Sequence, residues 1–283
     1  MKVTVAKSAG FCFGVKRAVD KVYHEIENGK KPVYTYGPII HNDQVVSDLS
    51  DKGVQVIRGR EELSHLIEGT IIIRSHGVSR DIQEQMEQQG LTVVDATCPF
   101  VKKIHRIVEE ESSKGRRIVI IGDASHPEVK GICGWAKGPV DVVVNREEAE
   151  NLRLPKTCGV TVVGQTTFNY KKFKEIVEIF DKKGYDVYVI STICNATEER
   201  QSEAREIAST VDAMIVIGGR HSSNTQKLYD ICKEKCTNTY FIETLVDLDF
   251  RPFQSFSHVG ITAGASTPNK IIEEVQENVR IKL

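Results

Sequence analysis

Three cysteines stand at the same point of a recurring strand–cysteine–helix pattern. Cys98 ends the segment Val93–Thr97, which begins as an apolar strand, and Pro99 follows it as a residue that favours the first turn of a helix. Cys12 and Cys194 end two similar segments, and the intervals between the three cysteines are 86 and 96 residues. This spacing indicates a threefold internal repeat with one thiol in each unit. Three such thiols can meet at a shared axis, where they can bind a common ligand.

Strands alternate with amphipathic helices through all three rounds of the repeat. The expected strands are the runs 3–5, 33–36, 54–57, 70–73, 93–97, 118–121, 140–144, 160–163, 187–190, 213–217, 240–242 and 259–262. The alternation predicts an α/β fold of parallel sheets with right-handed crossovers, in which ligands bind at the carboxyl ends of the strands. In this chain of 283 residues we expect three pseudo-threefold-related α/β units, covering 1–97, 98–193 and 194–283.

Polar residues follow the second and the fourth strand of each round. Those after the second strand lie 28 or 29 residues beyond their own cysteine, and those after the fourth strand lie 64 to 72 residues beyond it. The first set is His41, His126 and Ser222, and the second is His76, Thr166 and Ser266. Because parallel strands end at one edge of a sheet, these side chains and the thiols are expected to face one centre. Neutral donors of this kind, to which we add Ser223 and Asn224, suit a phosphate or diphosphate.

A carboxyl group close to this predicted centre can supply protons. Glu128 lies two residues after His126 in a segment that we interpret as a glycine-bounded loop. Thr166 and Thr167, in the next polar loop, are placed to orient Glu128 or a substrate hydroxyl. The alternatives are a solvated loop glutamate and threonines that cap a helix.

Three thiolates fit two kinds of metal centre. One is a [4Fe–4S] cluster in which the fourth iron has no protein ligand and acts as a Lewis acid toward a substrate oxygen. The other is a zinc ion held by three cysteines and a histidine or water. The remaining cysteines have no equivalent positions, and we expect them to be packing residues: Cys133, Cys158, Cys232 and Cys236.

Composition excludes several classes of function. The net charge of −1 leaves no broad basic field for nucleic acid or an anionic membrane, so neither is an expected partner. No apolar run has the length of a membrane span, and the first residues are too short and interrupted for a signal peptide. Seven cysteines, an odd number, argue for metal-binding or catalytic thiols rather than disulfides, and we expect a cytoplasmic protein.

An ordered series of motifs resembles one family over essentially the whole chain. The motifs are AGFCFGVKRAV, GPIIHN, RSHGV, DATCPFV, SHPEV, GQTT, the segment Cys194–Thr197 followed by Arg200–Gln201, SSN and TAGAS. In this order they resemble the LytB/IspH family of 4-hydroxy-3-methylbut-2-enyl diphosphate reductases, which catalyse the last step of the methylerythritol phosphate route to isoprenoids. Asn195, after the third cysteine, departs from the residues that we associate with the family, such as tyrosine, but leaves the predicted ligands in place.

The resemblance implies a trefoil of three α/β units around a [4Fe–4S] cluster bound by Cys12, Cys98 and Cys194. It implies that the substrate hydroxyl binds the open iron, and that Glu128, helped by Thr166 and His126, supplies protons. Two electrons from a ferredoxin or flavodoxin would then cleave the carbon–oxygen bond and give isopentenyl and dimethylallyl diphosphate. The substrate diphosphate would be held by His41, His76, His126, Ser222, Ser223, Asn224 and Ser266.

Two other readings stay open at this point. One is a non-catalytic iron–sulfur protein that senses redox state or carries electrons, which needs the cluster but no proton donor facing it. The other is a structural zinc protein with three similar units.

Overall fold

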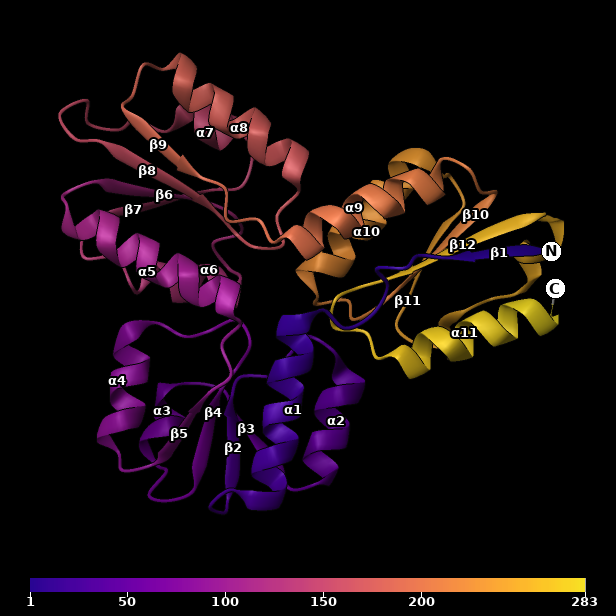
Figure 1. The fold of residues 1–283 in the computed structure, drawn as a ribbon, viewed down its shortest axis with the longest axis horizontal. Helices are drawn as coiled ribbons and strands as arrows, with labels where there is room; N and C mark the ends of the chain where they lie inside the picture. Colours follow the sequence, from indigo (N-terminus) through magenta and orange to yellow (C-terminus); the bar gives the residue numbers. More distant parts are fainter. Residues whose placement is uncertain (283) are drawn as a thin grey trace. The chain divides into compact units, whose positions relative to one another are not determined.

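The computed structural model describes residues 1–282, and three parallel sheets of four strands each form the framework of this part of the chain (Figure 1). The strand orders are β3–β2–β4–β5, β7–β6–β8–β9 and β1–β12–β10–β11. Written from its other edge, the third order is β11–β10–β12–β1, which has the same arrangement of strands as the first two sheets. The predicted α/β class with parallel sheets is confirmed. The strands are β1 (Lys2–Val5), β2 (Val33–Tyr36), β3 (Val54–Ile57), β4 (Thr70–Ile73), β5 (Thr92–Asp95), β6 (Arg117–Ile121), β7 (Val140–Val143), β8 (Val160–Gly164), β9 (Val187–Ile190), β10 (Ala213–Ile217), β11 (Thr239–Ile242) and β12 (His258–Ala263).

The strand that leads to each cysteine lies at the edge of the sheet of the preceding round. β5 pairs with β4, β9 with β8, and β1, from the start of the chain, with β12 near its end. These three edge strands are half-exposed, whereas the central strands β4, β8 and β10 are completely buried and consist almost wholly of apolar residues. The first strand of the chain, β1, therefore completes the sheet that the last strands form.

The chain forms two compact units. One contains residues 1–16, 41–45 and the segment from 195 onward, and it holds the sheet with β1. The other contains residues 17–40 and 46–194, and it holds the remaining two sheets. The three-part division at 97/98 and 193/194 stays a prediction.

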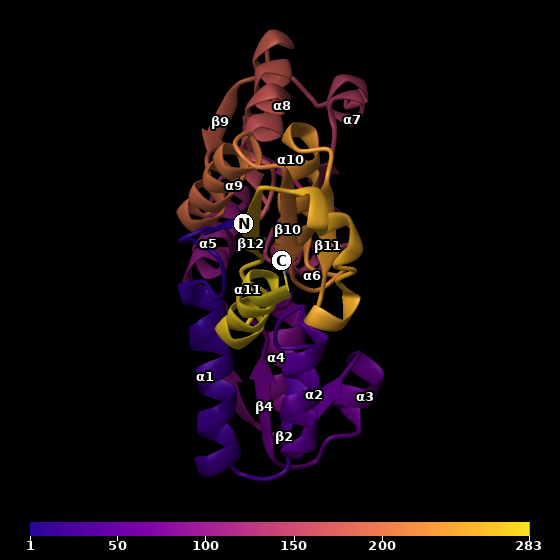
Figure 2. The ribbon, with the colours of Figure 1, turned by 90° about the vertical axis from the view of Figure 1, so that its right-hand side faces the viewer.

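Helices connect the strands and cover both faces of the sheets. In the unit with two sheets, α5 and α6 lie on one face of the sheet β7–β6–β8–β9, and α7 and α8 lie on the other (Figure 1). In the unit with β1, α9 and α10 cover one face and α11 covers the other, where it lies beside β1 (Figure 1, Figure 2). The helices are α1 (Phe13–Asn28), α2 (Asp43–Asp51), α3 (Arg60–Ser64), α4 (Arg80–Gln88), α5 (Pro99–Ser113), α6 (Pro127–Cys133), α7 (Arg146–Asn151), α8 (Tyr170–Lys182), α9 (Asn195–Ala208), α10 (Ser223–Lys235) and α11 (Asn269–Lys282), with 3₁₀ turns η1 (Leu245–Asp247) and η2 (Arg251–Ser255).

Two helices differ from the sequence-based expectation. We predicted a glycine-bounded loop around Glu128, but this residue lies in the first turn of α6. Pro127 begins this helix after the N-cap residue His126, and a Cβ added at Gly131 would lie 3.5 Å from the backbone of Val78. A helix of seven residues with a glycine at its fifth position carries too little periodicity to be recognised from sequence. The helix α2 was not predicted either.

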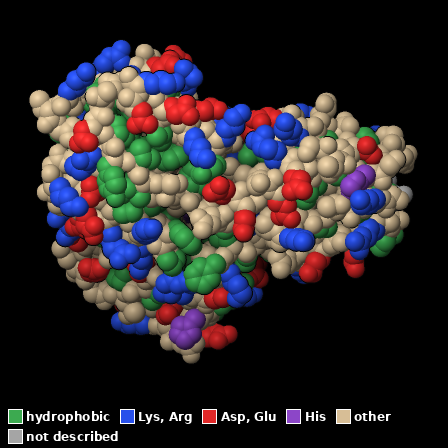
Figure 3. All heavy atoms as spheres, turned by 45° about the horizontal axis from the view of Figure 1, so that its top comes forward, with side chains coloured by type: hydrophobic (Ala, Val, Ile, Leu, Met, Phe, Trp, Pro, Cys, Tyr) green, Lys and Arg blue, Asp and Glu red, His purple; other side chains and the backbone are tan. Residues whose placement is uncertain are grey.

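The surface carries both signs of charge. On the face drawn in Figure 3, Lys and Arg side chains alternate with Asp and Glu, in agreement with 38 basic and 39 acidic residues in the sequence. Within residues 1–282, none of the helices has the length and apolar character needed to cross a membrane.

Candidate functional site

The predicted site residues follow pairs of neighbouring strands. In each sheet the second and the fourth strand of a round lie side by side, as β2 with β4, β6 with β8, and β10 with β12. The third strand lies on the outer side of the second, so the order of connection reverses between the paired strands. Ligands of parallel α/β sheets bind at such a reversal, beyond the carboxyl ends of the strands. Each of the three sheets therefore presents its polar loops at the edge where that sheet is expected to bind a ligand.

The residues after the second strands occupy matching positions. His41, His126 and Ser222 are each the fifth residue after the end of β2, β6 and β10, respectively. His126 and Ser222 also share a role, because each is the N-cap residue of the helix that follows. The spacing predicted from sequence is thus accurate for this set.

Each predicted metal-ligating cysteine is held by the loop after a fourth strand. The acceptor is always the carbonyl of the second residue after β4, β8 or β12. The three bonds are Cys12 N–H to Ala265 O (3.2 Å), Cys98 N–H to Ser75 O (2.9 Å) and Cys194 N–H to Thr166 O (3.1 Å).

This hydrogen-bond pattern also corrects one equivalence. From the sequence we matched Thr166 with His76 and Ser266. In the structure Thr166 has the position of Ser75 and Ala265, so Thr167 is the counterpart of His76 and Ser266.

Each of the three cysteines also lies at the N-terminus of a different helix. Cys98 is the N-cap residue of α5, and Cys12 and Cys194 immediately precede α1 and α9. The backbone N–H of Val15 donates to Cys12 Sγ at 3.5 Å. Each of the three is half-buried. A helix N-terminus favours negative charge, so these positions suit thiolates that bind a metal.

Glu128 is the carboxyl group that the structure buries most completely near these loops. It is 2% exposed, and Thr166 donates to it twice, from the backbone N–H to Oε1 (2.6 Å) and from Oγ1 to Oε2 (2.7 Å). Burial raises the pKa of Glu128, and the two bonds from Thr166 act in the opposite direction. The carbonyl of the same threonine accepts the N–H of Cys194, so one residue connects the carboxyl group to the cysteine.

Two histidine rings of the same unit contact each other at the N-terminus of α6. The rings of His76 and His126 meet edge to face, with centroids 5.3 Å apart. The backbone N–H of Glu128 donates to His126 Nδ1 (3.1 Å), so we assign the proton of the neutral ring to Nε2. His126 therefore presents an N–H donor on the side away from α6.

In the other unit, the N-terminus of α10 has the position that the N-terminus of α6 has in the first. Ser222 accepts from the backbone N–H of Thr225 (3.3 Å), and Ser223 and Asn224 occupy the first turn. Asn224 is 4% exposed, and its Nδ2 has no hydrogen-bond partner within the described residues. A buried amide donor without an acceptor, at the positive end of a thirteen-residue helix, fits an anionic ligand.

His41 and Ser266 lie together in this same unit. Ser266 Oγ donates to the backbone carbonyl of His41 at 3.1 Å. Gly219 approaches the same carbonyl so closely that an added Cβ would lie 2.7 Å from it. Glycine at this position therefore lets the two loops come together.

Sequence reasoning missed the arginines that support the cysteine loops. Arg200, 3% exposed, donates to Ala263 O (2.8 Å) and Gly10 O (3.1 Å), and so joins α9 to the segment before Cys12. Arg17 donates to Thr97 O at 3.0 Å, next to Cys98. Both arginines lie within motifs quoted above, but no local pattern indicates their roles, because their acceptors are backbone atoms distant in sequence.

Two of the four remaining cysteines have surroundings that do not favour thiolates. Burial raises the pKa of Cys232 to about 12 and also raises the pKa of Cys133. Cys236 is buried in the same cluster as Cys232. These surroundings agree with the expected packing role.

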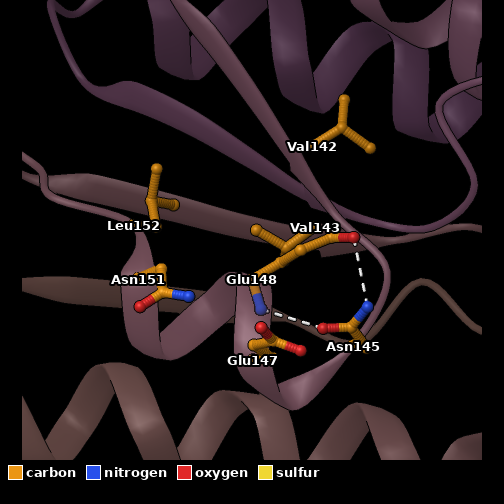
Figure 4. Close-up of a pocket in the computed structure, with 7 residues that line it drawn as sticks. All are labelled: Val142, Val143, Asn145, Glu147, Glu148, Asn151 and Leu152. Carbon is orange, nitrogen blue, oxygen red and sulfur yellow. Dashed lines mark hydrogen bonds between the residues drawn. The ribbon is translucent and has the colours of Figure 1, made fainter.

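A surface pocket of about 470 Å³ lies beside β7 and α7 (Figure 4). Its polar groups are used in capping α7: Asn145 Oδ1 accepts from Glu148 N–H (2.8 Å), and Asn145 Nδ2 donates to Glu148 Oε1 (3.1 Å). The Glu148 carboxylate also accepts the N–H of Val144 (2.8 Å). These acidic and amide groups stabilise a helix end.

Comparison with known proteins adds an independent line of support. A family described as "LytB protein" matches residues 3–280. The chain is 49% identical over 283 residues to the 4-hydroxy-3-methylbut-2-enyl diphosphate reductase of Caldanaerobacter subterraneus, covering 99% of this chain and 97% of that protein. It is 44% identical over 275 residues to the enzyme of the same name from Clostridioides difficile, covering 97% and 98%.

Solved structures agree with these relatives. The E-1-hydroxy-2-methyl-but-2-enyl-4-diphosphate reductase of Plasmodium falciparum matches with a TM-score of 0.92 at 29% identity, over 98% of this chain and 87% of that one. A second structure, described as (E)-4-hydroxy-3-methyl-but-2-enyl diphosphate reductase, the terminal enzyme of the non-mevalonate pathway, matches with a TM-score of 0.70 at 43% identity. That match covers 99% of both chains.

Proposed function

We propose that this protein, which belongs to the LytB protein family, reduces 4-hydroxy-3-methylbut-2-enyl diphosphate to isopentenyl and dimethylallyl diphosphate. This is the last step of the methylerythritol phosphate route to isoprenoids. The observation that carries the proposal is the buried Glu128 carboxyl, which Thr166 connects directly to the Cys194 loop. Relatives that match nearly the full length of the chain bear the name of this reductase.

The reaction needs both electrons and protons. The carbon–oxygen bond of the substrate hydroxyl breaks, two electrons and two protons are consumed, and the oxygen leaves as water. A carbon–hydrogen bond replaces it in either product. Amino-acid side chains supply protons but no reducing equivalents of this kind, so a redox group is required.

The cysteines fit an iron–sulfur cluster. The family is known for iron–sulfur enzymes, and three half-buried thiols of this chain stand at helix N-termini in matching positions. Cys12, Cys98 and Cys194 would hold a [4Fe–4S] cluster whose fourth iron has no protein ligand. When bound, this group supplies electrons and a Lewis-acidic iron for the substrate hydroxyl.

Glu128 is the proposed proton source. Burial keeps its carboxyl protonated to higher pH than an exposed glutamate, which suits a group that must give up a proton during turnover. Thr166 fixes the orientation of the carboxyl through two hydrogen bonds. His126, whose Nδ1 accepts from the backbone N–H of Glu128, holds its Nε2–H toward the substrate.

Neutral donors would bind the diphosphate. Asn224 contributes a buried amide and the α10 N-terminus its backbone N–H groups, and the histidines and hydroxyls add further donors without a magnesium ion. The proposed set is His41, His76, His126, Thr167, Ser222, Ser223, Asn224 and Ser266. A ferredoxin or flavodoxin would supply the electrons, and we place the reaction in the cytoplasm, where thiols stay reduced.

Anaerobic turnover tests the proposal. Protein reconstituted with iron and sulfide is mixed with 4-hydroxy-3-methylbut-2-enyl diphosphate and dithionite with methyl viologen, and the products are separated by chromatography. We expect both five-carbon diphosphates. Unchanged substrate in the presence of a fully loaded cluster would overturn the proposed activity.

The pH dependence of turnover is expected to respond to the Thr166 hydroxyl. Turnover needs protonated Glu128, so kcat stays constant below the pKa of Glu128 and falls as the pH rises through it. Thr166→Val removes a hydrogen bond that lowers this pKa, so the fall in kcat moves to higher pH. A fall that moves to lower pH, in kcat profiles measured with chemical reductant, contradicts the assigned proton donor.

Loss of the Asn224 amide is expected to weaken diphosphate binding. Asn224→Ala removes a buried donor to a charged ligand, and a change of about 1.4 kcal/mol corresponds to an affinity loss of about tenfold. The inhibition constant of inorganic pyrophosphate measures this effect. Asn151→Ala, at an exposed asparagine in α7, is the matched control and leaves the inhibition constant unchanged. Equal constants in all three proteins exclude Asn224 from the diphosphate site.

A further inference from the structure

Two cationic side chains of α1 contact the loop that carries Cys98, and three more follow this cysteine within eight residues on α5. On α1, Arg17 donates to Thr97 O (3.0 Å) and Lys21 donates to Asp95 O (2.8 Å). Both acceptors lie in the few residues before Cys98. On α5, which begins directly after this cysteine, Lys102 and Lys103 are adjacent. Arg106 follows them by four and three residues, so it lies one helical turn further along. We call these five residues the α1/α5 cationic surface.

Carboxylates within contact distance neutralise little of this charge. Asp95 forms an ion pair with Lys102. Arg17, Lys21, Lys103 and Arg106 have no ion pair within the described residues. Burial lowers the pKa of Lys21, repulsion by Arg17 and Lys102 adds to this effect, and attraction to Asp95 and Glu25 opposes it. The whole chain has a net charge of −1, so this local excess is a property of one place.

A cavity of about 440 Å³ opens on the same surface. Its walls include Thr97 and Pro99, the two neighbours of Cys98 in the chain, together with Lys102 and Arg106. Trp135 forms another wall, where its indole stacks on His105 with ring centroids 5.1 Å apart. Asp95 also lines the cavity, where it pairs with Lys102, so Arg106 is the wall cation without an ion pair among the described residues. A protruding acidic side chain can therefore enter beside Arg106.

An exposed aromatic residue stands beside the cavity. Phe100, two residues after Cys98, is 43% exposed on the first turn of α5. Exposed aromatic side chains surrounded by charged residues are typical of contact surfaces, because they bury apolar area at little entropic loss.

We propose that the α1/α5 cationic surface, with the cavity and Phe100, is the docking site of a small acidic electron-carrier protein. The inference rests on the proposed reduction, which consumes two electrons per turnover and therefore needs two encounters with a one-electron carrier. In each encounter the carrier is oxidised by one electron. Complementary charge steers such encounters and makes them depend on ionic strength.

The single tryptophan of the chain gives a direct binding test. Trp135 lies in the cavity wall, so its fluorescence is titrated with an acidic ferredoxin, with corrections from a free tryptophan derivative. We expect saturable quenching that weakens with added salt. The Lys103→Glu/Arg106→Glu variant is expected to raise the dissociation constant about tenfold, and Lys103→Gln/Arg106→Gln by less.

Two controls separate docking from other effects. Lys182→Glu changes an exposed lysine on α8, on the opposite face of the second sheet, and is expected to bind the ferredoxin like the unmodified protein. Basic cytochrome c, a redox protein of opposite charge, is expected to leave Trp135 fluorescence unchanged. Equal ferredoxin binding by all variants, or preferential binding of anionic lipid vesicles or RNA at this surface, overturns the proposed docking.

Kinetics distinguish docking from the proposed reaction itself. The Lys103→Glu/Arg106→Glu variant is expected to show a KM for ferredoxin about tenfold higher, with unchanged turnover by dithionite and methyl viologen. An equal loss with both reductants contradicts the docking site. Absence of turnover in the unmodified protein, together with charge-dependent quenching of Trp135, refutes the proposed reaction and leaves the docking site supported.

Discussion

Glu128→Gln is expected to reduce kcat by about 10²- to 10⁴-fold while the protein keeps its fold and its cluster. The glutamine side chain has the shape of the carboxylic acid, and it can still accept from the Thr166 N–H and pair with the Thr166 hydroxyl. It has no acidic proton to give. Because burial already favours the neutral form of Glu128, the neutral amide is tolerated at this position.

Steady-state turnover with chemical reductant measures the effect, and the absorption spectrum of the cluster reports whether the centre is intact. Glu148→Gln is the matched control, because Glu148 also lies in the first turn of a helix, α7, but takes part in capping only. Full turnover by Glu128→Gln would remove Glu128 from the mechanism and favour a redox role that needs no proton donor. An unchanged spectrum with lost turnover assigns the defect to proton supply.

Single Cys→Ser substitutions at Cys12, Cys98 and Cys194 are expected to abolish most of the iron binding and turnover. A hydroxyl is a much poorer ligand for iron than a thiolate, and each of these cysteines occupies one of three equivalent helix N-termini. The same change at Cys158, which is half-buried and lies outside this pattern, should retain the iron. Iron content per chain, determined after anaerobic purification, measures the effect.

The other cysteines complete this comparison. Cys133→Ser should keep the iron, and Cys232→Ala and Cys236→Ala are preferable to serine because these two thiols are buried among apolar residues. Loss of iron in all seven single variants would mean that the threefold pattern has no power to identify ligands. Loss in the first three alone supports a shared centre.

The sheets were predictable because their central strands are buried on both faces. A strand such as β10 is an uninterrupted apolar run, and turn residues bound it on both sides, so its existence follows from composition alone. The pairing of strands with one another could not be predicted from composition. That β1 completes the sheet of β12 depends on contacts across the whole chain, which local patterns do not encode.

The candidate site was predictable where residue spacing determines position. His41, His126 and Ser222 each follow a strand by the same number of residues, so counting was sufficient to align them. The loops after the fourth strands vary in their distance from the cysteines, and only the cysteine N–H bonds show that Thr167, rather than Thr166, corresponds to His76. The support from Arg200 and Arg17 was not predictable, because long side chains reach backbone carbonyls that are distant in sequence.

The central claim is that three thiols of this chain hold an iron–sulfur cluster at which the reduction takes place. Iron, acid-labile sulfide and zinc, determined together in the anaerobically purified protein, test this claim most directly. We predict up to about four iron and four sulfide per chain with little zinc, since a [4Fe–4S] cluster with one open iron suits the three cysteines. Stoichiometric zinc without sulfide would contradict the account and show that the three cysteines form a structural zinc site.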